Sequence, residues 1–172
     1  MFGPILFLEK VMKFIRICSK KCYWKVKYGK RIKIGKNFKF RKGLIINIAK
    51  DGYLEIGNGV FFNNYCSINC HDKIIIGNNN LFGEGVKIYD HNHVFNNKQI
   101  RMATSFKTRP IVIGDRNWFG SNDVVLSGAK VGDCNVFSAG AIIKSEYTSD
   151  NLVKTIDKVS IEKIKYKGAV NG

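Results

Sequence analysis

The chain has 172 residues, of which 45% are hydrophobic and 24% charged, a composition typical of a globular domain and too apolar for a disordered one. Its 17 glycines and 2 prolines exclude a collagen-like or proline-rich chain. No apolar run approaches the roughly 20 residues that span a bilayer, and charged residues interrupt the N-terminal apolar stretch, so we expect a cytoplasmic protein. The odd number of 5 cysteines then favours reduced thiols.

Positive charge is concentrated in the N-terminal third. Residues 1–50 hold 15 of the 29 lysines and arginines but one of the 13 acidic residues, so they carry +14 of the net +16. Apolar and basic residues are interleaved through residues 1–27, which predicts a short amphipathic helix. This helix packs on the rest of the protein or contacts an anionic surface, either a glycan or the inner face of a membrane. We expect no nucleic-acid partner, because the aromatic residues fit a core pattern and no RNA-binding motif is present.

Large apolar residues recur every six positions. The longest series is Ile113, Phe119, Val125, Val131, Phe137 and Ile143, and shorter series begin at Tyr28, Ile56 and Ile76. A period of six fits neither a helix nor a simple alternating strand. It fits a short strand followed by a tight turn, so that three units make one triangular coil. Gly, Asn and Asp often follow the apolar positions, and these residues tolerate the positive φ of tight corners.

The repeats therefore predict an all-β solenoid over residues 28–145, in which stacked coils bury a shared apolar column. Residues 146–172 are expected to form a C-terminal tail. Residues 89–112 have no six-residue phase, and a long loop on a rigid solenoid is a favoured place for function. This loop begins with the sequence Tyr-Asp-His-Asn-His, which holds two of the 3 histidines.

Two segments resemble a known family. GVKIYDHNHVF (residues 85–95) and PIVIGDRNWFGSNDVVLSGAKVGDCNVFSAGAIIK (residues 110–144) are similar to the hexapeptide-repeat acyltransferases. The likeness is greatest to the branch of maltose and galactoside acetyltransferases that includes capsule and O-antigen O-acetyltransferases. It covers residues 30–145 and implies a left-handed parallel β-helix, a homotrimer, and acetyl-CoA bound as co-substrate between neighbouring subunits.

Acetyl transfer from a thioester to a hydroxyl requires a general base. Histidine can take the proton from the hydroxyl and return it to the departing thiolate, without a covalent intermediate. The resemblance places this base at His93, five residues after Ile88, with His91 as the alternative. Asp90 is close enough in sequence to orient an imidazole ring.

The resemblance also implies positions that bind the substrates. Asn63 matches a position that contacts the acceptor hydroxyl, although a corner asparagine has the same sequence pattern, and Trp118 can stack on sugar or cofactor. Small residues match positions along which the pantetheine arm lies, and lysines can meet the phosphates. The expected cofactor-binding residues are Trp118, Gly120, Ser121, Ala139, Gly140, Lys144 and Lys163.

These observations predict an acetyl-CoA-dependent O-acetyltransferase that acts on a sugar hydroxyl of a capsular, O-antigen or other surface polysaccharide, or of its precursor. Two alternatives stay open: an N-acetyltransferase that acts on an amino-sugar nucleotide, and a β-solenoid that binds without catalysis. We expect no metal, because the spacing of Cys66, Cys70 and His71 is not that of a zinc site.

Overall fold

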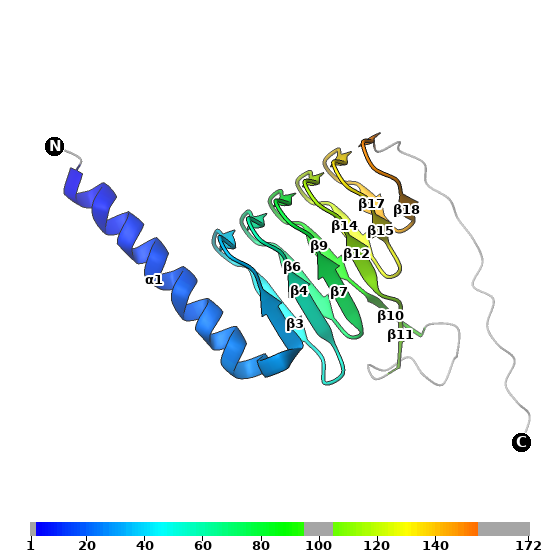
Figure 1. Ribbon diagram of the computed structural model, residues 1–172, viewed down its shortest axis with the longest axis horizontal. Helices are drawn as coiled ribbons and strands as arrows, with labels where there is room; N and C mark the ends of the chain where they lie inside the picture. Colours follow the sequence, from blue (N-terminus) through cyan, green and yellow to red (C-terminus); the bar gives the residue numbers. More distant parts are fainter. Residues whose placement is uncertain (1–2, 95–104, 155–172) are drawn as a thin grey trace, which may run out of the picture.

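The chain folds as a parallel β-solenoid with a helix at its N-terminal end (Figure 1). The structure is a computed structural model that describes residues 3–94 and 105–154. Helix α1 spans Gly3–Tyr28, and a short 3-10 turn at Gly29–Arg31 leads into the first coil. Successive coils contribute short strands to three sheets, which form the sides of a triangular stack.

Each of the three sheets runs along the whole stack. Sheet A contains β1 (Ile32–Ile34), β4 (Tyr53–Ile56), β7 (Lys73–Ile76), β12 (Ile111–Ile113), β15 (Lys130–Val131) and β18 (Glu146–Tyr147). Sheet B contains β2 (Lys39–Phe40), β5 (Phe61–Phe62), β8 (Leu81–Phe82), β13 (Trp118–Phe119), β16 (Val136–Phe137) and β19 (Leu152–Val153). Sheet C contains β3 (Ile45–Ile48), β6 (Ser67–Cys70), β9 (Lys87–Tyr89), β14 (Val124–Leu126) and β17 (Ile142–Ile143). The turns between the sheets are called the AB, BC and CA corners.

Apolar side chains from the three sheets fill the inside of the stack. All six residues of the longest six-residue series are buried, with at most 4% of each exposed. The phenylalanines of sheet B stack ring on ring from coil to coil, with centroids 4.2 Å apart for Phe62 and Phe82 and 4.6 Å apart for Phe82 and Phe119. Such aromatic pairs add about 0.5–1.5 kcal/mol each beyond their buried area. The predicted β-solenoid with stacked coils is thus confirmed.

Close backbone contact shapes the AB corner. A column of glycines occupies it: Gly35, Gly57, Gly77, Gly114 and Gly132. A Cβ built on Gly77 would lie 2.6 Å from the carbonyl oxygen of Gly114, so the stacking leaves no room for a side chain here. Two residues after the glycine, the backbone has positive φ, at Asn79 (56°) and also at Arg116 (57°). Arginine in this region is strained, whereas asparagine tolerates it.

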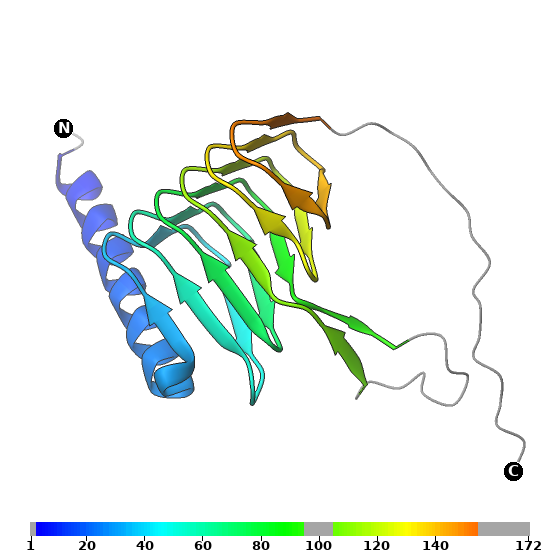
Figure 2. The ribbon, with the colours of Figure 1, turned by 45° about the vertical axis from the view of Figure 1, so that its right-hand side comes forward.

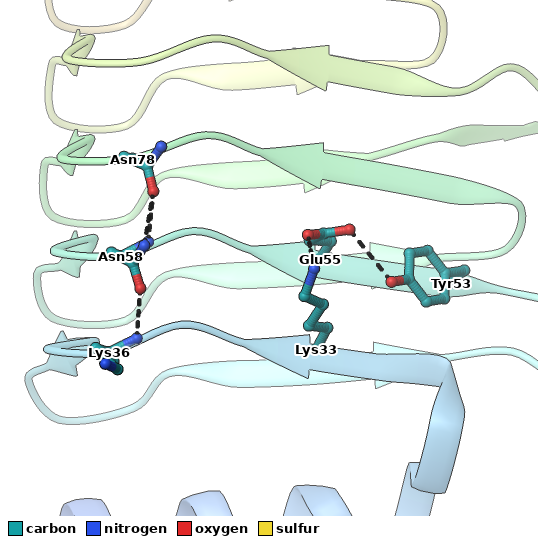
Figure 3. A network of polar contacts seen from close by, with 6 residues as sticks. All are labelled: Lys33, Lys36, Tyr53, Glu55, Asn58 and Asn78. Carbon is teal, nitrogen blue, oxygen red and sulfur yellow. Dashed lines mark hydrogen bonds and ion pairs between the residues drawn. The ribbon is translucent and has the colours of Figure 1, made fainter.

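Polar side chains at the AB corner link each coil to the next. Asn58 Oδ1 accepts the backbone N–H of Lys36 at 2.8 Å, and Asn78 Oδ1 accepts that of Asn58 at 2.9 Å (Figure 3). Asp115, Asp133 and Ser149 continue the ladder in the following coils. The frequent Asn and Asp residues of the repeats therefore satisfy backbone donors at a corner where no sheet partner is available.

A second polar group joins the first coils on the outer face of sheet A. Lys33 Nζ lies 2.7 Å from Glu55 Oε1, and the Tyr53 hydroxyl donates to Glu55 Oε2 at 3.2 Å (Figure 3). This hydrogen-bonded pair lowers the pKa of Glu55. The Lys33 side chain is two-thirds exposed, so the pair adds little to stability.

The C-terminal half of α1 closes the N-terminal end of the stack (Figures 1 and 2). Trp24 is 2% exposed, and its ring lies 5.3 Å from that of Phe40. The Tyr28 hydroxyl donates to the carbonyl of Ile46 at 2.8 Å. These contacts cover the apolar column of the first coil, as expected for a helix that packs on the solenoid. Within the part of the chain that the structure describes, no helix is long and apolar enough to cross a membrane.

The solenoid extends further than residue 145, where the six-residue phase ends. β18 pairs with β15, and β19 pairs with β16, so a sixth coil reaches Val153. The phase is lost because Tyr147 follows Ile143 by four residues instead of six. The expected loop 89–112 contains two antiparallel strands, β10 (His91–His93) and β11 (Phe106–Thr108), which project from the CA corner.

Candidate active site

Three histidines meet at the CA corner, where the β10–β11 hairpin leaves the solenoid. The register of β6 on β9 pairs residues 20 positions apart, which brings His71 beside His91. Their rings are stacked with centroids 3.7 Å apart. Phe106 of β11 contacts the group, with its centroid 4.4 Å from His71 and 4.7 Å from His93. The hairpin therefore places both predicted histidines on one side of β10, against the same aromatic ring.

Asp90 lies beneath this cluster and is fully buried. Its Oδ1 accepts the backbone N–H of His71 at 2.8 Å, and its Oδ2 accepts that of Asp72 at 2.7 Å. His91 Nδ1 lies 3.3 Å from the same Oδ1. A carboxylate beside Nδ1 favours the tautomer that keeps the proton there and leaves Nε2 as the basic nitrogen. Burial, followed by the nearby His91, lowers the pKa of His71, so His71 is neutral at pH 7.

His93 is exposed and lines a groove of about 470 Å³ beside the hairpin. The other lining residues are Asn92, Val94, Lys107, Thr108, Arg109 and Ser127. Arg109 is held in place by a bond of 3.3 Å from Nη2 to the carbonyl of Ser127. Among the described residues, the lining includes two basic and no acidic side chains, so the groove favours an anionic group near His93.

A second groove, of about 450 Å³, runs along the BC corner. Its lining includes five of the predicted residues: Asn63, Trp118, Gly120, Ser121 and Ala139. Trp118 is 52% exposed and forms one wall, together with the outward-facing Leu81 and Val136. The backbone N–H of Gly140 donates to the carbonyl of Ser121 at 2.9 Å, so Gly140 adjoins this groove. Small residues leave the backbone at its floor accessible to an extended ligand.

The two groups of predicted residues lie at opposite ends of the strands of sheet C, one at the BC corner and the other at the CA corner. In the coil that holds β9, the segment from Val86 to Asp90, which contains this strand, separates the BC corner from the CA corner. Four residue steps of a strand span about 13 Å, and both the groove and the histidines lie beyond its ends. One chain therefore does not bring Trp118 and His93 together. Lys144 follows β17 at the CA corner, away from the BC groove, and Lys163 lies outside the described residues.

The cysteines near His71 belong to the core. Cys66 and Cys70 are fully buried, and their thiols donate to the carbonyls of Gly83 and Tyr53. Burial raises the pKa of Cys66, and burial together with Asp90 raises the pKa of Cys70 to about 12. A cysteine ligates a metal as the thiolate, so neither buried thiol is suited to that role. In residues 3–94 and 105–154, no group of three His, Cys, Asp or Glu side chains is arranged so that it could hold a metal ion.

Several residues of the histidine cluster and of the two grooves were not expected from the sequence. His71 is one, because its contact with His91 depends on the 20-residue register between β6 and β9. Phe106 and Arg109 are others, and no repeat phase marks them because they lie within residues 89–112, which interrupt the six-residue period. Leu81 and Val136 belong to the outward positions of sheet B, which the inward apolar period does not predict.

The solenoid has the fold of known proteins. No protein-family model matches the chain. A hexapeptide-repeat acetyltransferase of Vibrio cholerae, solved with acetyl-CoA, has the same fold, with a TM-score of 0.68 and 23% identity over 80% of this chain and 72% of that one. The chain thus has the fold of the hexapeptide-repeat acetyltransferases, as its repeats predict.

Two relatives extend the resemblance to sequence. The chain is 25% identical over 160 residues to a protein of Escherichia coli K12 named as a lipopolysaccharide biosynthesis O-acetyl transferase, WbbJ, with 88% of this chain and 81% of that protein covered. It is 26% identical to a maltose O-acetyltransferase of Clostridium difficile, with a TM-score of 0.52 over 72% of this chain and 63% of that one. The predicted resemblance to these acetyltransferases is confirmed, and it supports acyltransferase activity.

Proposed function

We propose that the protein transfers an acetyl group from acetyl-CoA to a hydroxyl of a sugar that belongs to a surface polysaccharide or its precursor. The observation that carries the proposal is the division of the predicted residues between two grooves. One has an indole wall and small residues at its floor, and the other has histidines on a projecting hairpin. The named relatives, O-acetyl transferases of a lipopolysaccharide pathway and of maltose, support a carbohydrate acceptor.

The BC groove suits the acetyl-CoA arm. Gly120 cannot carry a side chain, because a Cβ there would lie 2.5 Å from the backbone nitrogen of Ala139. The exposed Trp118 ring offers an apolar face along the groove. A flat wall beside accessible backbone fits the pantetheine arm, which is extended and carries two amide groups.

A histidine of β10 supplies the base. Its neutral imidazole takes the proton of the acceptor hydroxyl as that oxygen attacks the thioester carbonyl. The carbon–sulfur bond then breaks, and the imidazolium returns the proton to the sulfur, so that the acetylated sugar and the free thiol leave. We assign this role to His93, which faces the open groove, and keep His91 as the alternative because Asp90 can fix its tautomer.

A second copy of the chain completes the site. Since the histidines and the BC groove lie at opposite ends of sheet C, we propose a homotrimer in which the hairpin of one subunit meets the groove of its neighbour. Solution scattering is expected to give three times the 19.5 kDa chain mass. The mass of a monomer would contradict a site formed between two subunits.

Subunit mixing tests the activity and the arrangement together. Subunits with both His91→Ala and His93→Ala lack the base, and subunits with Ser121→Trp have a filled groove, so each is inactive alone. After random one-to-one mixing, about one interface in four joins an intact hairpin to an intact groove, and we expect about 25% of wild-type thiol release. Ser121→Ala is the matched control and keeps activity.

The result separates the alternatives. If each site were built within one chain, the mixture would stay inactive while the wild type released thiol. If only amino sugars accelerate thiol release, the protein is an N-acetyltransferase. If no acceptor in a panel of sugars does so, but acetyl-CoA or glycans still bind, the solenoid is a binding module and the proposal fails.

A further inference from the structure

Helix α1 has an apolar side that the solenoid does not cover. Trp24 and Tyr28 face the first coil, whereas Val26 lies about 200° around the helix from Trp24 and is 81% exposed. The same outward side repeats at steps of three and four residues towards the N-terminus. It comprises Leu8, Met12 and Ile15, which are 60%, 60% and 54% exposed, followed by Ser19, Cys22 and Val26. We call these six residues the outer stripe.

Basic side chains lie on the rest of the surface of α1. Helix α1 contains seven of them and one acid, Glu9. They are Lys10, Lys13, Arg16, Lys20, Lys21, Lys25 and Lys27. The first coil adds exposed bases at Lys30, Lys36, Lys39, Arg41 and Lys42. Helix α1 lies across the N-terminal end of the stack (Figures 1 and 2). Its exposed apolar side chains and the basic residues of α1 and the first coil are therefore gathered at one end of the molecule.

We propose that the outer stripe of α1 enters the interface of an anionic lipid bilayer, with its bases at the lipid phosphates. The helix then lies in the plane of the membrane, and the solenoid stands on its N-terminal end. Each side of the helix has a distinct contact in this arrangement. Trp24 and Tyr28 hold it to the solenoid, the outer stripe reaches the acyl region, and the lysine stems extend towards the headgroups.

The chemistry of the helix favours lipid over other anionic partners. A polysaccharide or nucleic acid can pair with the lysines but offers no apolar phase to Leu8, Ile15 and Val26. A second copy of α1 offers an apolar face, but it brings seven further bases and one acid into the same contact. An anionic bilayer complements both the charge and the apolar stripe. The proposal does not depend on acetyl transfer.

Vesicle sedimentation tests this with the full chain. The protein is expected to bind vesicles of phosphatidylcholine mixed with phosphatidylglycerol, and to bind pure phosphatidylcholine weakly. Binding should fall when salt shortens the Debye length from about 10 Å at 0.1 M to about 3 Å at 1 M. Equal binding to both kinds of vesicle at all salt concentrations would overturn the charge part of the proposal.

Matched variants separate the stripe from general surface hydrophobicity. Leu8→Ser with Ile15→Ser should lower the vesicle partition coefficient at least about tenfold, because two large apolar side chains no longer leave water. Val112→Ser with Leu152→Ser, exposed positions on the strands, should leave it unchanged. Melting temperatures report whether both variants fold, which is expected because all four side chains are exposed.

A second pair tests the bases. Lys13→Gln with Lys20→Gln should weaken binding by about fivefold for each charge, whereas Lys73→Gln with Lys130→Gln, away from α1, should have little effect. The proposal fails if the serine variant of α1 binds vesicles like the wild type. It also fails if that variant lowers the mass of the assembly in vesicle-free solution, since a second copy then covers the stripe.

Discussion

Asp123 places a carboxyl group at a core position that is apolar in the adjacent coils, where Val86 and Ala141 occupy the same place in the stack. Its Oδ1 accepts the backbone N–H of Ala141 at 2.8 Å, and its Oδ2 has no partner among the described residues. Burial is the main cause that raises the pKa of Asp123 from its ordinary value of 3.8 to about 6. Ionised Asp123 therefore destabilises the fold at neutral pH.

The size and sign of this effect follow from proton linkage. A pKa that rises by about two pH units corresponds to about 3 kcal/mol, at about 1.4 kcal/mol for each unit. Because the folded protein holds the proton more tightly, the stability from Asp123 is fully present below about pH 3.8. It is lost as the pH rises through about 6, and the net cost at pH 7 is about 3 kcal/mol.

Asp123→Asn tests this reasoning, because the amide keeps an oxygen for the Ala141 N–H and cannot ionise. In denaturant titrations, the variant's stability relative to wild type should rise by about 2 kcal/mol between about pH 4 and about pH 7. Asp115→Asn is a control for which the stability difference from wild type should change with pH in the opposite direction. Hydrogen bonds from Asn78 lower the pKa of Asp115, so that carboxylate adds stability above its ordinary pKa, and the stability is lost as the pH falls. A pH-independent difference for Asp123→Asn would refute the argument.

Three further predictions concern the base, the cap and the glycine column. His93→Ala should lower turnover by about 10²–10⁴-fold with acetyl-CoA binding retained, and His91→Ala should lower it much less; steady-state kinetics that give the reverse order would move the base to His91. Trp24→Ala should destabilise the fold by about 3–5 kcal/mol in denaturant titrations, and a loss below about 1 kcal/mol would show that α1 does not cap the core. Gly77→Ala should lower the melting temperature, because its Cβ would meet the Gly114 carbonyl oxygen at 2.6 Å; an unchanged value would mean that the corner can widen.

The sequence predicted the solenoid because its geometry repeats in the chain. One inward side chain per strand gives the six-residue period, and residues such as Phe119 and Val125 fall where that period places them. The prediction was less complete where the period changes. Tyr147 follows its predecessor by four residues, so the sixth coil was not expected, and Arg116 adopts a positive φ that its residue type does not predict.

The site was predicted residue by residue but not as an arrangement. The motif around His91 and His93 and the small residues near Gly120 were identified from the sequence. Gly120, Ser121 and Ala139 line one groove together with the predicted residues Asn63 and Trp118. The distance between the histidines and the groove depends on which corner of the coil each turn occupies. The six-residue period does not reveal this, because it is the same at every corner. Contacts such as that of His71 with His91 need the register between coils, which follows only when turn lengths are known.

The triangular cross-section gives a physical reason for the proposed assembly. A coil holds its corners apart by the length of a strand, and hydrogen bonds to the coils on either side prevent a corner from moving towards another. Two domains joined by a hinge can close over a ligand. A rigid solenoid has no such hinge, so it cannot bring a second wall of its own over the groove. It can gain a second wall only from a projecting segment or from another copy. The β10–β11 hairpin leaves the stack at the CA corner (Figure 2), whereas the groove lies at the BC corner, which favours a neighbouring subunit as the source of that wall.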